Sequence, residues 1–115
     1  MSLVTDYVIK TGDLGPPIDA ICRDGTGAIV NLTGATGVRF IMRSNDDPSG
    51  VPKVAAAGSI IGLATDGHVR YTWVAANVDT AGLYDAEFEV TFAGPAPQTF
   101  PNDRQIVILI TPDLD

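Results

Sequence analysis

The sequence has little positive charge, one cysteine and one histidine. Lys and Arg together number 7 against 14 Asp and Glu residues, so the formal net charge at pH 7 is -7. Proteins that bind nucleic acid or anionic membranes use clustered Lys and Arg side chains, and we therefore expect neither partner. A single Cys can form neither an intramolecular disulfide nor a cysteine-based zinc site. The hydrophobic core must then stabilise the fold without a covalent or metal cross-link.

Long hydrophobic runs are also missing. The longest apolar run, Ile106 to Ile110, is far shorter than the roughly 20 residues that cross a bilayer. Residues 1–10 contain no basic segment followed by an apolar one, so we expect no standard export signal and no membrane anchor. The length of 115 residues, without a repeat or a charge block, predicts a single domain over residues 1–115.

Turn residues divide the chain into short segments that alternate apolar and polar side chains or are rich in β-branched residues. This rhythm predicts an all-β sandwich or barrel. The strands are expected at residues 5–10, 18–23, 28–32, 37–44, 51–57, 59–64, 68–74, 83–92 and 104–111. Asp24-Gly25 and Asp66-Gly67 predict tight turns, because Asp-Gly supplies the positive φ values that such turns need. Residues 75–80 have room for one helical turn and no more.

Two of these segments predict strands with one apolar face and one largely charged face. In residues 83–92 every second side chain is apolar and the others are mostly acidic, namely Asp85, Glu87 and Glu89. In residues 37–44 the apolar set alternates with Arg39, Ile41 and Arg43. If the two strands are neighbours, the arginines face the carboxylates. Each such pair contributes about 0.2–1 kcal/mol, so the pairs set register more than stability.

The last strand is apolar on both faces. A half-buried strand at this place leaves Val107 and Leu109 on the solvent side. One interpretation is a central strand, or one covered by neighbouring loops and the N-terminal segment. The other is a subunit interface, and on this hypothesis Val107 and Leu109 are the candidate interface residues.

Side chains that could carry chemistry do not form a recognisable site. Asp85, Glu87 and Glu89 are spaced about 7 Å apart on one strand face, but a solvated face beside arginines lowers carboxyl pKa values, whereas a glycosidase acid needs a raised one. His68 flanks a turn, and Cys22 shares a face with core residues, so neither indicates a nucleophile. We expect no catalytic residues and no enzyme activity.

Binding sites for metals, cofactors and sugars are equally unsupported by the residue pattern. The acidic loops around Asp24 and at residues 45–47 lack the 12-residue ligand spacing of an EF-hand, and turn chemistry explains them. Tyr71 and Trp73 share a face with Val69, which predicts core positions rather than a surface platform for sugars. We therefore expect neither a cofactor nor a metal.

One motif indicates a specific sandwich. The run from Asp79 through Gly82 to Tyr84 resembles the D-x-x-G-x-Y corner of immunoglobulin-like domains, where the Tyr hydroxyl bonds to backbone a few residues upstream and Gly permits the turn. Ala86 stands where antibody domains have a Cys. The prediction is an immunoglobulin-like β-sandwich of about seven to nine mostly antiparallel strands, with Asp79, Gly82 and Tyr84 at its structural corner.

Short motifs along most of the chain add a family resemblance. They are Val8-Ile9-Lys10, Gly12-Asp13, Asn31-Leu32-Thr33-Gly34-Ala35, Val38, Phe40, Gly67, Val69, Tyr71, Trp73, Ala81-Gly82-Leu83-Tyr84, Glu87-Phe88 and Thr99-Phe100-Pro101-Asn102. In this order and spacing the chain resembles the immunoglobulin-like domain at the N-terminus of phage baseplate upper proteins and their short tail-associated relatives. Longer relatives continue into helical and receptor-facing regions, whereas this sequence stops at Asp115.

The resemblance implies a non-enzymatic virion component that docks into a tail or baseplate through protein contacts. The expected partners are phage tail and baseplate proteins, with self-association as a further expected mode. The expected location is the virion, after assembly in the bacterial host cytoplasm, which suits an acidic protein with one free Cys. The alternative hypothesis is a carbohydrate-binding or host-adhesion module, which requires aromatic side chains exposed in a groove.

Overall fold

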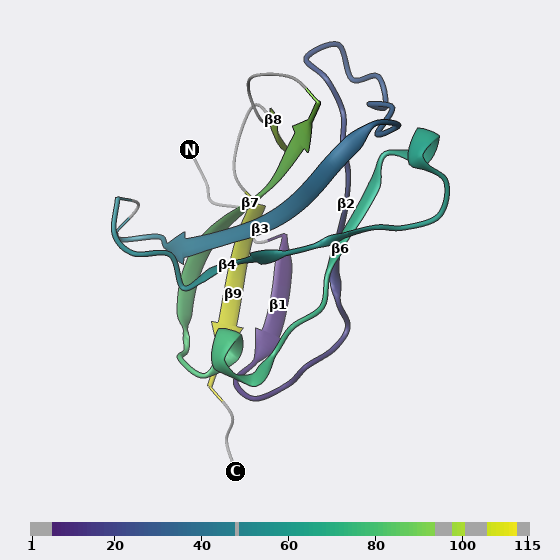
Figure 1. Cartoon of the computed structure of the whole chain (residues 1–115). Helices are drawn as coiled ribbons and strands as arrows, with labels where there is room; N and C mark the ends of the chain where they lie inside the picture. Colours follow the sequence, from purple (N-terminus) through teal and green to yellow (C-terminus); the bar gives the residue numbers. More distant parts are fainter. Residues whose placement is uncertain (1–5, 48, 94–97, 101–105, 113–115) are drawn as a thin grey trace.

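Two β-sheets face each other across the hydrophobic core, and the prediction of an all-β, sandwich-like architecture is confirmed (Figure 1). The computed structural model describes residues 6–47, 49–93, 98–100 and 106–112. Its strands are β1 (Tyr7–Lys10), β2 (Ile18–Ile21), β3 (Ala35–Ser44), β4 (Val54–Ala57), β5 (Ser59–Ile60), β6 (His68–Tyr71), β7 (Gly82–Phe92), β8 (Gln98–Phe100) and β9 (Ile106–Thr111). Two 3₁₀ turns, η1 (Ala64–Asp66) and η2 (Ala75–Val78), lie between strands. No helix in these ranges is long and apolar enough to span a membrane.

The larger sheet has the strand order β1-β9-β7-β3-β4, and the smaller has the order β2-β6-β5. β8 pairs with β7 beyond the end of β9, so the long strand β7 holds two partners along one edge. Within the described ranges β1 and β9 are parallel, while the other pairs of strands are antiparallel. The prediction of mostly antiparallel strands is therefore confirmed.

The core forms where the inward faces of the two sheets meet. The inward side chains of β3 and β7 are buried, and β7 alternates as predicted; on β3, Ile41 is buried as well although it lies on the outward side. An aromatic cluster at the centre crosses the two layers: Phe40 of β3 stacks on Tyr71 of β6 with 4.7 Å between ring centroids. Trp73 meets both rings edge-on at 5.6 Å. Burying these rings against one another contributes much of the apolar area that stabilises the fold.

One side of the sandwich is closed by the backbone itself. The amide of Gly58, between β4 and β5, donates to the carbonyl of Val38 in the larger sheet, and the next residue, Ser59, pairs with Arg70 in the smaller one. A Cβ atom at position 58 would lie 3.0 Å from the Arg70 carbonyl oxygen and 3.2 Å from the Val38 side chain. Glycine therefore lets one strand pass closely from sheet to sheet.

The opposite side is closed by a side chain. The Tyr7 hydroxyl on β1 donates to the carbonyl of Pro16, just before β2, and accepts a hydrogen bond from Trp73 Nε1 at 3.1 Å. Burial raises the pKa of the Tyr7 hydroxyl further above neutral pH, so the protonated hydroxyl donates this bond. This bridge links the outer strands of the two sheets.

Several predicted strand boundaries are wrong. Residues 28–32 form no strand. The chain folds back there as a hairpin, in which a single antiparallel β-bridge pairs Arg23 with Ile29. The predicted strand at 59–64 ends at Ile60 and gives way to η1. β8 was not expected from the sequence. In the first Asp-Gly turn the positive φ belongs to Gly27 rather than Gly25, because the Asp24 carboxylate accepts hydrogen bonds from residues 26 and 28 and extends the loop.

Candidate docking surface

The corner residues meet at the start of β7. The Tyr84 hydroxyl donates to the carbonyl oxygen of Thr80 at 2.8 Å, the hydrogen bond that the corner hypothesis describes. Gly82, between them, has a φ of 154°, which only glycine adopts without strain. Asp79 accepts hydrogen bonds from the Thr80 hydroxyl and from Lys53, at 2.9 and 2.5 Å. Lys53 holds the pKa of the Asp79 carboxyl below its usual range. The role of Lys53 was not foreseen, because its distance in sequence gives no signal.

Replacing Tyr84 with phenylalanine tests the corner. The ring keeps its buried position, but the Thr80 carbonyl loses its donor, so the free energy of unfolding should fall by about 1–2 kcal/mol. Urea denaturation followed by tryptophan fluorescence measures the change, and a far-UV spectrum identical to that of the parent shows that the fold is kept. A loss below about 0.3 kcal/mol would mean that the hydrogen bond does not hold the corner.

β9 lies inside the larger sheet, between β1 and β7. Both of its edges are paired, so β9 itself cannot accept a further strand. Val107 and Leu109 point to the outer face of the sheet, as the alternation predicts, and both are half-buried. At β9, a partner can therefore contact side chains on the outer face but not unpaired backbone.

The outward side chains of β9 belong to a larger apolar surface. In register with Leu109 stand Val8 on β1 and Leu83 on β7, and Val8 is 57% exposed. We call Val8, Leu83, Val107 and Leu109 the apolar patch. Val8 and Leu83 were not predicted to belong to this surface. The alternation of β1 carries the signal for Val8, because Tyr7 and Ile9 flank it and point inward.

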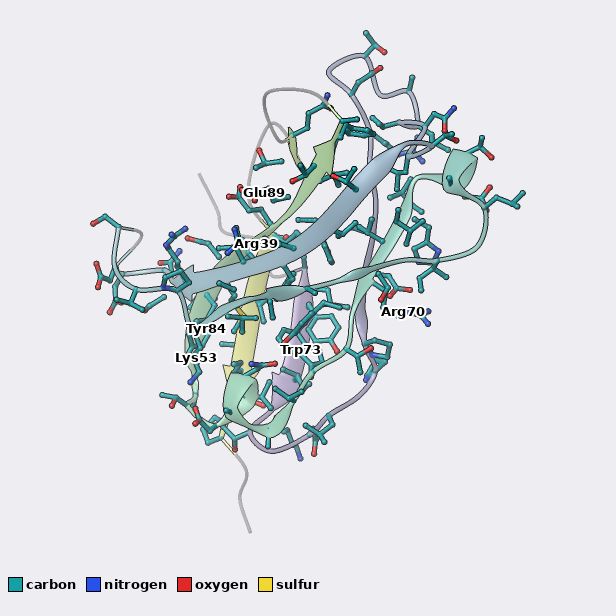
Figure 2. The ribbon with its side chains drawn as sticks, in the orientation of Figure 1. Arg39, Lys53, Arg70, Trp73, Tyr84 and Glu89 are labelled. Atoms are coloured by element: carbon teal, nitrogen blue, oxygen red, sulfur yellow. The ribbon has the colours of Figure 1, made fainter. Side chains whose placement is uncertain are left out.

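Charged side chains cover the other half of this face (Figure 2). β3 and β7 are neighbours, so the arginines face the carboxylates, and Arg39 forms an ion pair with Glu89 at 3.3 Å. Arg43 faces Asp85 in register but donates to the Gly50 carbonyl, and Asp85 accepts from the Asn45 amide instead. The exposed Arg39–Glu89 pair is worth about 0–1 kcal/mol, so it orders the surface rather than stabilising the fold.

The outer face of the smaller sheet has a different character. Asp19 on β2 receives two hydrogen bonds from Arg70 and lies 2.9 Å from His68 Nε2. The Arg70 guanidinium, more than His68, holds the pKa of the Asp19 carboxyl below its usual range. Figure 2 shows Arg70 on the side of the molecule away from the larger sheet. Arg70 and Asp19 therefore form an ion pair across β6 and β2, and His68 contacts the same carboxylate.

The remaining candidate for chemistry is Cys22. Its side chain is buried, and burial raises the pKa of the thiol to about 11, so the reactive thiolate is scarce at neutral pH. The prediction that Cys22 is a core residue is confirmed. In the ranges that the structure describes, no group of three or more His, Cys, Asp or Glu side chains is arranged to hold a metal ion.

Aromatic side chains do not form a surface platform. Tyr71 and Trp73 are buried, which confirms the core positions predicted for them. Phe92 and Tyr7 are partly covered and pack against the core, and the other aromatic side chains are buried. Among the described residues, no aromatic side chain is more than partly exposed.

Comparisons with known proteins add no relative. No family model matches the sequence, and neither the curated proteins nor the solved structures give a significant match.

Proposed function

We propose that this chain is an immunoglobulin-like domain that serves as a non-enzymatic structural component of a phage or prophage tail or baseplate. It acts by docking to other proteins of the assembly. The observation that carries the proposal is the apolar patch on the outer face of the larger sheet, where a free-standing domain places polar side chains. Such a patch is typical of a surface that another protein covers.

The immunoglobulin-like assignment rests on two features. The chain forms two facing sheets, and the Tyr84 hydroxyl bonds to the backbone four residues upstream at the start of β7. Both features accompany the crossover between sheets in immunoglobulin-like domains.

The tail or baseplate assignment rests on the sequence resemblance. Val8-Ile9-Lys10 contributes to β1, and Ala81-Gly82-Leu83-Tyr84 leads into β7, so two of the matching motifs lie at the strands that border β9. Pro101 and Asn102 of the last motif lie outside the described residues. The carbohydrate-binding alternative gains no support from the structure, since the aromatic side chains it needs are packed in the core.

Co-expression with the tail and baseplate proteins encoded beside its gene tests the proposal. We expect the tagged chain to co-purify with at least one of them at a fixed stoichiometry. A glycan array probed with the same protein should stay silent. Failure to bind any of these proteins, or a glycan signal that competes with soluble sugar, would overturn the assignment.

A further inference from the structure

The apolar patch has opposite charges at its two ends. At one end Lys10, on β1, stands in register with Thr111 on β9. At the other end Asp6 and Asp85 flank Val107: Asp85 stands in register with it on β7, and Asp6 accepts a hydrogen bond from the Val107 amide. The row formed by Val8, Leu83 and Leu109 therefore separates a basic end from an acidic end that also contains Val107.

The outer face of the larger sheet is nearly neutral, although the chain is strongly acidic. The net charge of the chain is -7. Among the described residues, the outward positions on this face carry three cations and four carboxylates: Lys10, Arg39, Arg43, Asp6, Asp85, Glu87 and Glu89. Many of the remaining carboxylates lie in loops, including Asp13, Asp24, Asp46 and Asp47, and Asp66 ends η1. Repulsion between two copies is therefore weakest where these faces meet.

We infer that the apolar patch is covered by the same patch of a second copy, in a two-fold dimer whose facing strands run in opposite directions. Such a dimer deepens the proposed docking function, on which it rests, by naming one partner. A two-fold axis in the plane of the interface and across the strands brings each apolar patch onto its equivalent. The same rotation places the Lys10 end of each copy over the acidic end of the other.

Charge balance distinguishes this occupant from a basic peptide. A strongly cationic partner is attracted to the acidic loops, where the negative charge is concentrated, rather than to a face that already carries its own cations. The basic and acidic ends of the apolar patch are instead complementary to the acidic and basic ends of the same patch in a second copy. A second copy is the partner that supplies an apolar surface and the complementary ends together.

Sedimentation velocity of the full chain over a concentration series tests the dimer. We expect a reversible monomer–dimer equilibrium for the parent protein. Val8→Lys places a charge in the apolar patch at a side chain that is already 57% exposed, so folding is kept. It should raise the dissociation constant at least tenfold, or about 1.4 kcal/mol. The matched control is Val74→Lys, 55% exposed between β6 and η2, which should change it less than twofold.

The orientation of the two copies is tested by a second pair of variants. Lys10→Glu reverses the basic end of the patch and should weaken the dimer about tenfold. Arg23→Glu makes the same change in net charge away from this face and should have less than a threefold effect. Equal effects of the two variants would show that only net charge matters and would overturn the proposed orientation.

The outcomes separate this inference from the proposed function. A parent protein that stays monomeric up to about 1 mM, or a dimer that Val8→Lys leaves intact, overturns the inference even if the chain captures a tail protein. A dimer sensitive to Val8→Lys but not to Val74→Lys supports the inference even when every tail and baseplate protein fails to bind, a result that would overturn the proposed function alone.

Discussion

Replacing Phe40 with alanine is expected to lower the free energy of unfolding by about 3–5 kcal/mol. The Phe40 ring is fully buried and is shared by both layers of the core. It stacks on Tyr71, meets Trp73 edge-on and lies 5.1 Å from Phe88 between ring centroids. Alanine loses these contacts and leaves a cavity that rigid neighbouring rings cannot fill. Because small domains are stable by only about 5–15 kcal/mol, the loss removes a large part of the total.

Equilibrium urea denaturation of Phe40→Ala and of the parent measures this difference. Val74→Ala, at an exposed position, is the control and should change stability by less than about 0.5 kcal/mol. Phe40→Leu should fall between the two, since it keeps much of the buried volume. A loss below about 1 kcal/mol for Phe40→Ala would show that the aromatic cluster does not anchor the two sheets.

Replacing Gly67 with alanine is expected to lower the free energy of unfolding by about 2–4 kcal/mol, for two separate reasons. Gly67 has a φ of +65°, a left-handed conformation that costs a residue with a Cβ atom about 1 kcal/mol. The added Cβ would also lie 2.7 Å from the Ile29 side chain and 2.9 Å from the Val30 carbonyl oxygen. The Val30 carbonyl belongs to the backbone of the hairpin that contains the Arg23–Ile29 bridge. It cannot move aside without breaking the contact between β6 and that hairpin.

Gly12→Ala separates the two causes. Gly12 also has a positive φ, +85°, but nothing lies within 4 Å of the Cβ that alanine would add. It should therefore cost about 1 kcal/mol, and the excess for Gly67→Ala measures the steric term. Thermal and urea denaturation of both variants gives the comparison. Equal losses at the two positions would contradict the close packing of the hairpin on Gly67.

Where a strand has one buried face, the sequence pattern was sufficient to predict which side chains point into the core. The patterns of β7 and β3 predicted that Arg39 and Glu89 would face each other if the two strands were neighbours, and the observed pairing meets that condition. The pattern was not sufficient where tertiary contacts decide the outcome. Residues 28–32 look like a strand, but after the Arg23–Ile29 bridge Asn31 turns the chain by accepting a hydrogen bond from the Thr33 amide.

The candidate docking surface was half predictable. Val107 and Leu109 stand out because an alternating strand has no reason to be apolar on both faces. Their register neighbours Val8 and Leu83 come from distant parts of the chain, and single-sequence periodicity does not show which strands lie beside β9. The crossing at Gly58 is invisible for a similar reason, since the close approach that requires glycine involves backbone from β6.

Immunogold labelling of purified phage particles tests the central claim most directly. An antibody against this chain, applied to particles from the host strain that carries its gene, should place gold at the tail or baseplate. Particles from a strain in which the gene is deleted are the control and should stay unlabelled. Unlabelled parent particles, with the protein detected only in the soluble fraction of the lysate, would contradict a structural role in the virion.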